Sequence, residues 1–293
     1  FADACQVAVD VFTMMAPQIT GALAGGEALP GGRVGRVALG LRASAVSGFV
    51  PDLRTRGLQA GAAQRLPIGS EAAPVPAPVL DAGVGVFPGI ELGVGSLGFG
   101  RVGSLGLLAS IAYLPELEDG SSSLRTPGGS VRFGYGARLG LIEGVPVLPE
   151  LSLAVIDRRL PTVRLAADAG GGESVRVDDL ALRVTSWRVL AAKRFPFVSF
   201  LAGAGQDRSR TAADIVATVS EFGVVTESQP VRLRQSLTRG TVFGGVTLRL
   251  GPVALSGEIG RQSGADVATY NPVDGEDPSA ARTFGSVALR LGI

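Results

Sequence analysis

The chain has 293 residues, of which 46% are hydrophobic and only 18% are charged, and its formal net charge is +1. A soluble domain usually carries about 25% charged residues, and a nucleic-acid-binding surface needs a clear excess of positive charge. The composition therefore disfavours an ordinary soluble domain and a nucleic-acid partner. No run of about 18 apolar residues occurs, so a transmembrane helix is excluded as well.

Residues 1–33 differ from the rest of the chain. Asp3 followed by Gln6 is a plausible capping box, and apolar residues then recur at helical spacing. Pro17 should end or kink this helix, and the glycines of "GALAGGEALPGG" break regular structure. The apolar stripe includes Val7, Phe12, Met14 and Met15. We expect a short helix and linker that plug a lumen, lie at its periplasmic mouth or contact a partner.

From Arg36 onward the apolar period becomes two, which indicates strands. The chain combines high hydropathy with strands rather than helices, and only a closed barrel allows strands to satisfy their backbone hydrogen bonds in lipid. We therefore expect an all-β fold, a transmembrane antiparallel up-and-down β-barrel over 34–293 with about ten strands (8–12 possible). The candidate strands are 34–49, 78–90, 98–114, 129–142, 147–164, 175–192, 197–207, 231–250, 253–262 and 281–293.

The connections between these strands alternate in length. Short turns fall at "IELGVGSL", "IEGVPV", "KRFPF" and "GPV". Short periplasmic turns opposite longer outer loops are typical of bacterial outer-membrane barrels. An even strand number places both termini on the short-turn side, and "PVPAPV" argues against strands in the first long loop. The long connections are 50–77, 115–128, 165–174, 208–230 and 263–280.

Alternation along the strands separates an aliphatic face from a small and charged one. In residues 129–142, Phe133 and Tyr135 should face lipid and the arginines should face the lumen. A salt-bridged network that fills the lumen and a constriction that favours anionic solutes both fit this pattern. Arg158 and Arg183 are less clearly placed. The lumen-lining candidates are Arg36, Arg42, Asp81, Arg132, Arg138, Arg249, Glu258 and Arg290.

Residues 34–293, with their alternating loops and terminal "FGSVALRLGI", resemble the bacterial outer-membrane β-barrel class, although Ile293 stands where such chains usually end in an aromatic residue. "GALAGGEAL" is faintly similar to the N-terminus of plugged fatty-acid-transporter-type barrels. The resemblance implies a bacterial outer-membrane location, contact with outer-membrane lipid and a signal peptide that has already been removed.

The chain has no histidine and a single cysteine, Cys5. The missing histidine removes the usual catalytic base of barrel hydrolases, and one cysteine allows no internal disulfide. The acidic loops "LPELEDGSSS" and "NPVDGEDPS" lack EF-hand spacing. We therefore expect no enzyme activity, no cofactor and no metal.

These patterns leave two main functional hypotheses. The first is a channel or transporter for small solutes, gated by the N-terminal segment and the lumenal arginines. The second is a non-conducting structural barrel whose outer loops, especially 50–77 and 208–230, bind a second copy or another envelope protein. A soluble Gly-rich β-sandwich is disfavoured by the low charge and by the alternating loop lengths.

Overall fold

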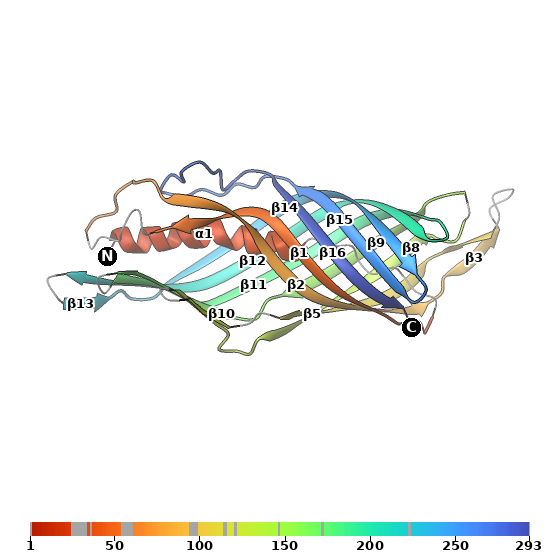
Figure 1. Ribbon diagram of the computed structural model, residues 1–293, viewed down its shortest axis with the longest axis horizontal. Helices are drawn as coiled ribbons and strands as arrows, with labels where there is room; N and C mark the ends of the chain where they lie inside the picture. Colours follow the sequence, from red (N-terminus) through yellow and green to blue (C-terminus); the bar gives the residue numbers. More distant parts are fainter. Residues whose placement is uncertain are drawn as a thin grey trace.

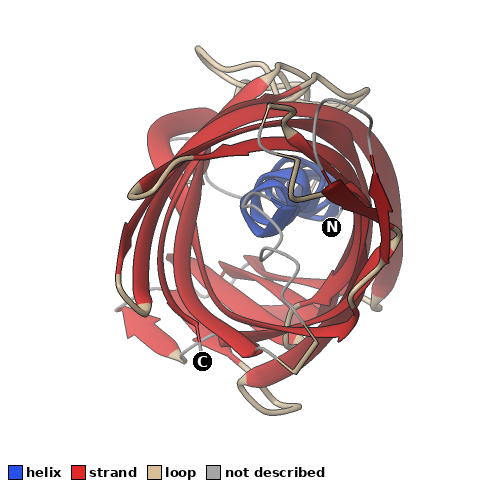
Figure 2. Cartoon of the chain, turned by 90° about the vertical axis from the view of Figure 1, so that its right-hand side faces the viewer, coloured by secondary structure: helices blue, strands red, loops and turns tan. Residues whose placement is uncertain are grey.

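The protein is a closed β-barrel with one helix inside it (Figures 1 and 2). The computed structural model describes residues 2–24, 34–35, 37–53, 61–93, 99–113, 116–119, 122–145, 147–170, 173–221 and 224–292. Ten antiparallel strands form a ring, because β11 pairs with β12 and closes the order β12-β14-β15-β16-β1-β2-β5-β8-β9-β11. The expected barrel of about ten strands is confirmed.

The ring consists of β1 (Val37–Asp52), β2 (Gly69–Phe87), β5 (Ser104–Tyr113), β8 (Val131–Ile142), β9 (Glu150–Arg159), β11 (Glu173–Arg194), β12 (Val198–Glu221), β14 (Val231–Leu250), β15 (Val253–Gln262) and β16 (Arg282–Gly292). The other elements are α1 (Ala2–Ala24), β3 (Ile90–Gly93), β4 (Phe99–Val102), β6 (Leu117–Asp119), β7 (Ser122–Arg125), β10 (Val163–Gly170) and β13 (Val224–Glu227).

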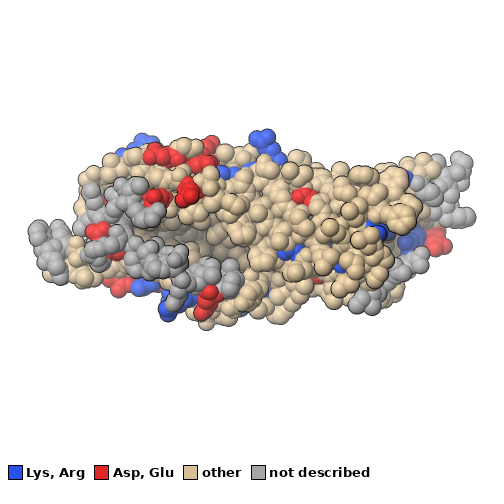
Figure 3. All heavy atoms as spheres, in the orientation of Figure 1, with Lys and Arg blue, Asp and Glu red and all other residues tan. Residues whose placement is uncertain are grey.

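The wall turns its aliphatic and aromatic side chains outward. Phe133 and Tyr135 on β8 are 68% and 60% exposed, whereas Arg138 on the same strand is buried. On the face shown in Figure 3, most acidic side chains gather toward the long-loop end at the left. In the part of the chain that the structure describes, no helix is long and apolar enough to span a membrane. A closed barrel with an apolar outer belt identifies an outer-membrane protein.

One side of the barrel is much taller than the other. β11, β12 and β14 have 22, 24 and 20 residues, whereas β5, β8 and β9 have 10, 12 and 10. The expected loops 165–174 and 208–230 are therefore wrong in large part, since most of their described residues continue the ladder. The extension buries apolar residues of β12, such as Ile215, against α1, and β10, β7, β6 and β13 add further pairs there.

The expected loop 50–77 is also shorter in the structure, because β2 begins at Gly69 and pairs with β1 through three prolines. Pro74, Pro76 and Pro78 share one parity, so their nitrogens point away from β1. On that side β2 has a described partner only from Val79 onward, where β5 joins it. A proline costs no ladder hydrogen bond at such an edge.

The short-turn end departs from expectation at one connection. Between β2 and β5 the chain forms the β3–β4 hairpin, which projects at the right of Figure 1, instead of one tight turn. The β14–β15 turn is as short as expected, with Gly251 at a φ of 66°. Glycine adopts this left-handed conformation without the steric cost of a Cβ.

α1 lies inside the ring of strands (Figure 2). It does not end at Pro17 but continues to Ala24, for 23 residues or about 35 Å of helix. Asp3 contacts loop residue Gly61 at the long-loop end, and the C-terminus of the chain lies at the opposite end (Figure 1). The expectation that both termini lie on the short-turn side is therefore wrong for the N-terminus.

Candidate functional site: the helix-filled lumen

The long-loop half of the lumen is packed around α1. Val7, Phe12 and Met14 are at most 5% exposed and join a core that includes Phe49 of β1 and Ile215 of β12. Of the three positions that the sequence left open for the helix, the structure has the one inside the barrel. Met15 is only partly buried.

Pro17 is accommodated by a side chain of the barrel wall. A proline at this position has no N–H to donate to the carbonyl of Thr13, four residues earlier. Gln235 of β14 points inward and donates its Nε2 hydrogen to that same carbonyl oxygen, at 3.3 Å. The wall thus supplies the hydrogen bond that the helix lacks, so the helix continues through the proline.

The carbonyls in the last turn of α1 accept no hydrogen bond from within the helix, and they face polar wall residues instead. Ser44 Oγ donates to the Ala22 oxygen at 2.9 Å. Gln262 Nε2 donates to the Gly21 oxygen at 3.0 Å. These contacts satisfy carbonyls that every helix leaves unpaired at its C-terminus.

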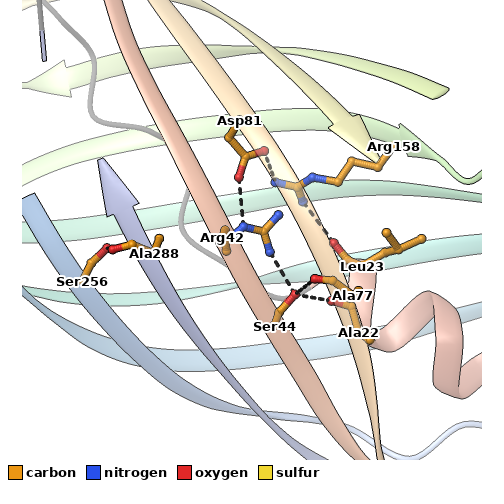
Figure 4. Close-up of polar contacts among 9 residues, drawn as sticks. All are labelled: Ala22, Leu23, Arg42, Ser44, Ala77, Asp81, Arg158, Ser256 and Ala288. Atoms are coloured by element: carbon orange, nitrogen blue, oxygen red, sulfur yellow. Dashed lines mark hydrogen bonds and ion pairs between the residues drawn. The ribbon is translucent and has the colours of Figure 1, made fainter. Parts of the chain in front are cut away.

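Beneath this helix end lies a buried ion network (Figure 4). Arg42 Nε is 2.9 Å from Asp81 Oδ2, and Arg158 Nη2 is 3.7 Å from Asp81 Oδ1. Arg158 also donates to the Leu23 carbonyl at 3.4 Å. Two arginines thus share one carboxylate, and the negative end of the helix dipole faces their excess positive charge. Arg42 is only 2% exposed, so this complementarity acts where solvent screening is weak.

Loops at the opposite end hold the start of α1 through two buried carboxylates. Asp10 accepts hydrogen bonds from the Tyr270 and Asn271 backbone N–H groups at 3.0 and 2.9 Å, and from Asn271 Nδ2 at 2.7 Å. Asp3 accepts one from the Gln64 N–H at 2.9 Å. The two loops also contact each other, since Leu66 N–H donates to Asn271 Oδ1 at 3.1 Å. The helix is therefore anchored at both ends.

The short-turn half of the lumen contains a cavity of about 660 Å³. Arg138 lies 3.8 Å from Glu143, and Arg249 Nη2 donates to Ser199 Oγ at 3.3 Å. Arg194 pairs with Glu150 at 2.5 Å. All of these side chains line the cavity, so its surface is polar and rich in arginine.

The remaining sequence-predicted residues lie in several places. Arg290 lines the cavity and also a small recess that it shares with Glu258. Arg132 has the inward parity but lies at the rim, where its Nη1 donates to the Gly128 carbonyl at 3.0 Å. Arg183 faces outward and pairs with Asp157. Arg36 lies outside the described residues.

Sequence reasoning missed several polar residues that organise the lumen. Asp10 was not singled out, although a carboxylate in an apolar helix needs partners. Arg188 pairs with Asp207 at 2.9 Å and lies over the Phe243 ring at 5.0 Å. Arg183 and Arg188 have opposite parity on β11, where the ladder is regular, so the two arginines face opposite sides of the wall. Among the described residues, no group of three or more potential metal ligands occurs.

No family model matches the chain, and no curated protein sequence matches it. Among solved structures, the transport unit of the autotransporter AIDA-I from Escherichia coli is similar at 9% identity and a TM-score of 0.39, covering 99% of this chain and 98% of that one. The translocator domain of the autotransporter NalP from Neisseria meningitidis is similar at 12% identity and a TM-score of 0.37, covering 99% of this chain and 98% of that one. An anion-selective porin from Comamonas acidovorans is similar at 12% identity and a TM-score of 0.22, covering 88% of this chain and 99% of that one. What these proteins share with the chain is the barrel architecture that the strand pairing already establishes.

Proposed function

We propose that the protein is a translocator-type barrel, which holds its own N-terminal segment across the membrane and seals its lumen with α1. The path of the chain carries this proposal. α1 begins among the loops of the long-loop end, whereas β1 begins at the opposite end. α1 therefore enters the lumen from the long-loop end, and the ten wall strands follow it in the chain. Any chain attached before Phe1 would emerge at the long-loop end.

The contacts of α1 support a seal that forms after passage. An α-helix with its side chains is about 10–12 Å wide, and the apolar residues of α1 and the inward residues of β12 bury each other. The ion network and the two buried aspartates then fix the helix in one position along the lumen. These contacts require a fully formed wall, so the helix would be held once the barrel has closed.

Cysteine labelling in intact cells tests the direction of the chain. In a Cys5→Ser background, one variant carries a cysteine placed before Phe1 and a matched variant carries Pro252→Cys in the β14–β15 turn. We expect a membrane-impermeant maleimide to label the first without permeabilisation and the second only after the outer membrane is opened. Labelling of the N-terminal cysteine only after permeabilisation would overturn the proposal.

A small-solute channel is the second candidate, and the arginine-lined cavity of about 660 Å³ is the observation that favours it. Arginine-lined constrictions favour anions. In this alternative α1 would be a gate, and the intact protein would pass current in bursts with anion selectivity. The partner-binding scaffold would instead stay closed even without α1. Bilayer conductance of the intact and helix-deleted proteins separates these three functions.

A further inference from the structure

Four neighbouring strands, the three on the tall side of the barrel and the shorter β9 beside them, change from apolar to basic toward the long-loop end. Their outward residues lie in hydrogen-bonded rows across β9, β11, β12 and β14. From the short-turn side upward, the rows are Leu153-Val189-Ala204-Val242, Val155-Trp187-Gln206-Gly240, Asp157-Thr185-Arg208-Thr238 and Arg159-Arg183-Arg210-Ser236. The change from apolar to basic is the boundary of the membrane belt at this end.

The arginines of the upper rows are incompletely neutralised. Asp157 pairs with both Arg159 and Arg183, at 3.3 and 2.6 Å. Arg208 and Arg210 form no ion pair within the described part of the chain, and the same holds for Arg234, which lies diagonally across from Arg210. All three are exposed. Like charges on directly opposed strand positions destabilise a sheet, and Arg183 lies opposite Arg210.

Hydroxyl groups complete the surroundings of these arginines. Ser236 is the ladder partner of Arg210, and Thr238 is the partner of Arg208. Directly opposed residues have Cβ atoms about 5 Å apart, so one tetrahedral anion can reach a guanidinium and a hydroxyl together. Guanidinium groups bind phosphate oxygens through paired N–H donors.

We propose that Arg208, Arg210 and Arg234, with Ser236 and Thr238, form a binding site for a phosphate-bearing lipid headgroup in the leaflet at the long-loop end. Two rows beneath Arg208, beyond the row that contains Trp187 and Gln206, the acyl chains of such a lipid would meet an apolar surface on Val189, Ala204 and Val242. A free phosphate ion has no acyl chain that could contact this surface. The headgroup would supply the negative charge that the row of arginines lacks.

The opposite wall provides an internal contrast. The outward residues of β1 from Leu41 to Ser47 are Leu41, Ala43, Ala45 and Ser47, and none is charged. Arg261 of β15 also faces outward, as the ladder partner of Val242, but it is the only charged residue among the outward positions of that strand from Val253 to Arg261. The three arginines of the proposed site instead cluster on β12 and β14, on the tall side.

The test uses the full chain in neutral detergent micelles and native mass spectrometry of bound lipid. The titrants are bis-phosphorylated lipid A, phosphatidylcholine and inorganic phosphate. The variant R208Q/R210Q/R234Q is compared with R65Q/R125Q/R132Q, which removes equal charge at the same end but away from the rows. Because each arginine near a lipid surface contributes about fivefold in affinity, we expect roughly hundredfold weaker lipid A binding in the first variant and none of that loss in the second.

A lysine variant separates the effect of charge from that of guanidinium geometry and serves as a control for misfolding of the glutamine variant. R208K/R210K/R234K keeps the positive charge but loses the planar fork, so lipid A binding should fall between wild type and the glutamine variant. Equal loss in both glutamine variants would overturn the site, because it would show non-specific attraction. Equally strong binding of phosphatidylcholine, whose phosphodiester is offset by its choline cation, would overturn the assignment to a headgroup with net negative charge. Full competition by inorganic phosphate would overturn the assignment to a lipid.

Discussion

The two halves of the lumen differ in the chemistry of their inward residues. In the long-loop half, inward residues such as Ala213, Ile215 and Val219 are apolar and are covered by α1. In the short-turn half, inward residues such as Arg138 and Arg249 line a cavity. An apolar surface needs a cover, whereas an arginine-lined surface is stable in water. The comparison shows that the wall itself specifies where the helix lies and where it ends.

The boundary between the two halves is the ion network beneath the end of α1. There the positive charge of Arg42 and Arg158 meets Asp81 and the carbonyl end of the helix. The cost of removing the Asp81 carboxylate should therefore depend on whether α1 is present.

The largest effect is expected from Asp81→Asn, which leaves two buried arginines without their shared carboxylate. Breaking a buried pair on one side costs about 3 kcal/mol, so urea unfolding in micelles should show a loss of this size. Asp266→Asn, in an exposed loop, is the control and should change the free energy of unfolding by less than about 0.5 kcal/mol. In a protein lacking residues 2–24, water reaches the arginines, and the cost of Asp81→Asn should fall below about 1 kcal/mol.

A smaller effect is expected at the long-loop end of the helix. Asp10→Ala removes the acceptor of three hydrogen bonds from Tyr270 and Asn271, which should cost about 2 kcal/mol. Hydrogen exchange of the two backbone amides should accelerate, while exchange in β11 stays unchanged. Unchanged protection of both amides would show that the aspartate does not hold this loop.

The contact that accommodates Pro17 can be tested by a double-mutant cycle. Gln235→Leu should cost about 1 kcal/mol, because it leaves the Thr13 carbonyl without its partner. Pro17→Ala restores a backbone N–H that can donate to the same carbonyl, so Gln235→Leu should cost less in that background. Additive costs in the cycle would mean that Gln235 acts independently of the proline.

The smallest effect is expected outside both halves of the lumen, at Glu116. The backbone N–H and hydroxyl of Thr126 donate to its carboxylate at 2.9 and 3.1 Å, which lowers the pKa of Glu116 below its ordinary value of 4.5. Its stabilising contribution is therefore present above pH 4.5 and is lost as the pH falls through the lowered pKa. NMR titration of Glu116 should show this lowered pKa, and Thr126→Val should raise it.

Strand patterning predicted the barrel because membrane burial imposes a period of two on every wall strand. It predicted outward Phe133 and Tyr135 and the buried parity of Arg42 and Arg138 for the same reason. Strand length was less predictable. The upper parts of β11 and β12 resemble loops in composition. They are strands because they pair with each other and because α1 covers their inward face.

The position of the helix could not be derived from local sequence. The apolar residues Val7, Phe12 and Met14 fit a lumen, a mouth or a partner equally well, and only the inward residues of distant strands distinguish these places. Pro17 misled because its compensating donor, Gln235, lies more than two hundred residues away. The prolines of β2 were misleading because a proline is tolerated at the open edge of a strand. Among the described elements, no strand pairs with residues 69–78 on the side away from β1.

Single-channel conductance of the purified protein in a planar bilayer, measured with and without residues 2–24, tests the central claim that α1 seals the barrel. We expect the intact protein to be closed and the deleted protein to give stable ion steps, with Asp81→Asn leaving the pore of the deleted form intact. Open steps from the intact protein would contradict the seal and favour a solute channel. Closed behaviour in both folded forms would contradict it as well, because the wall alone would then block the lumen.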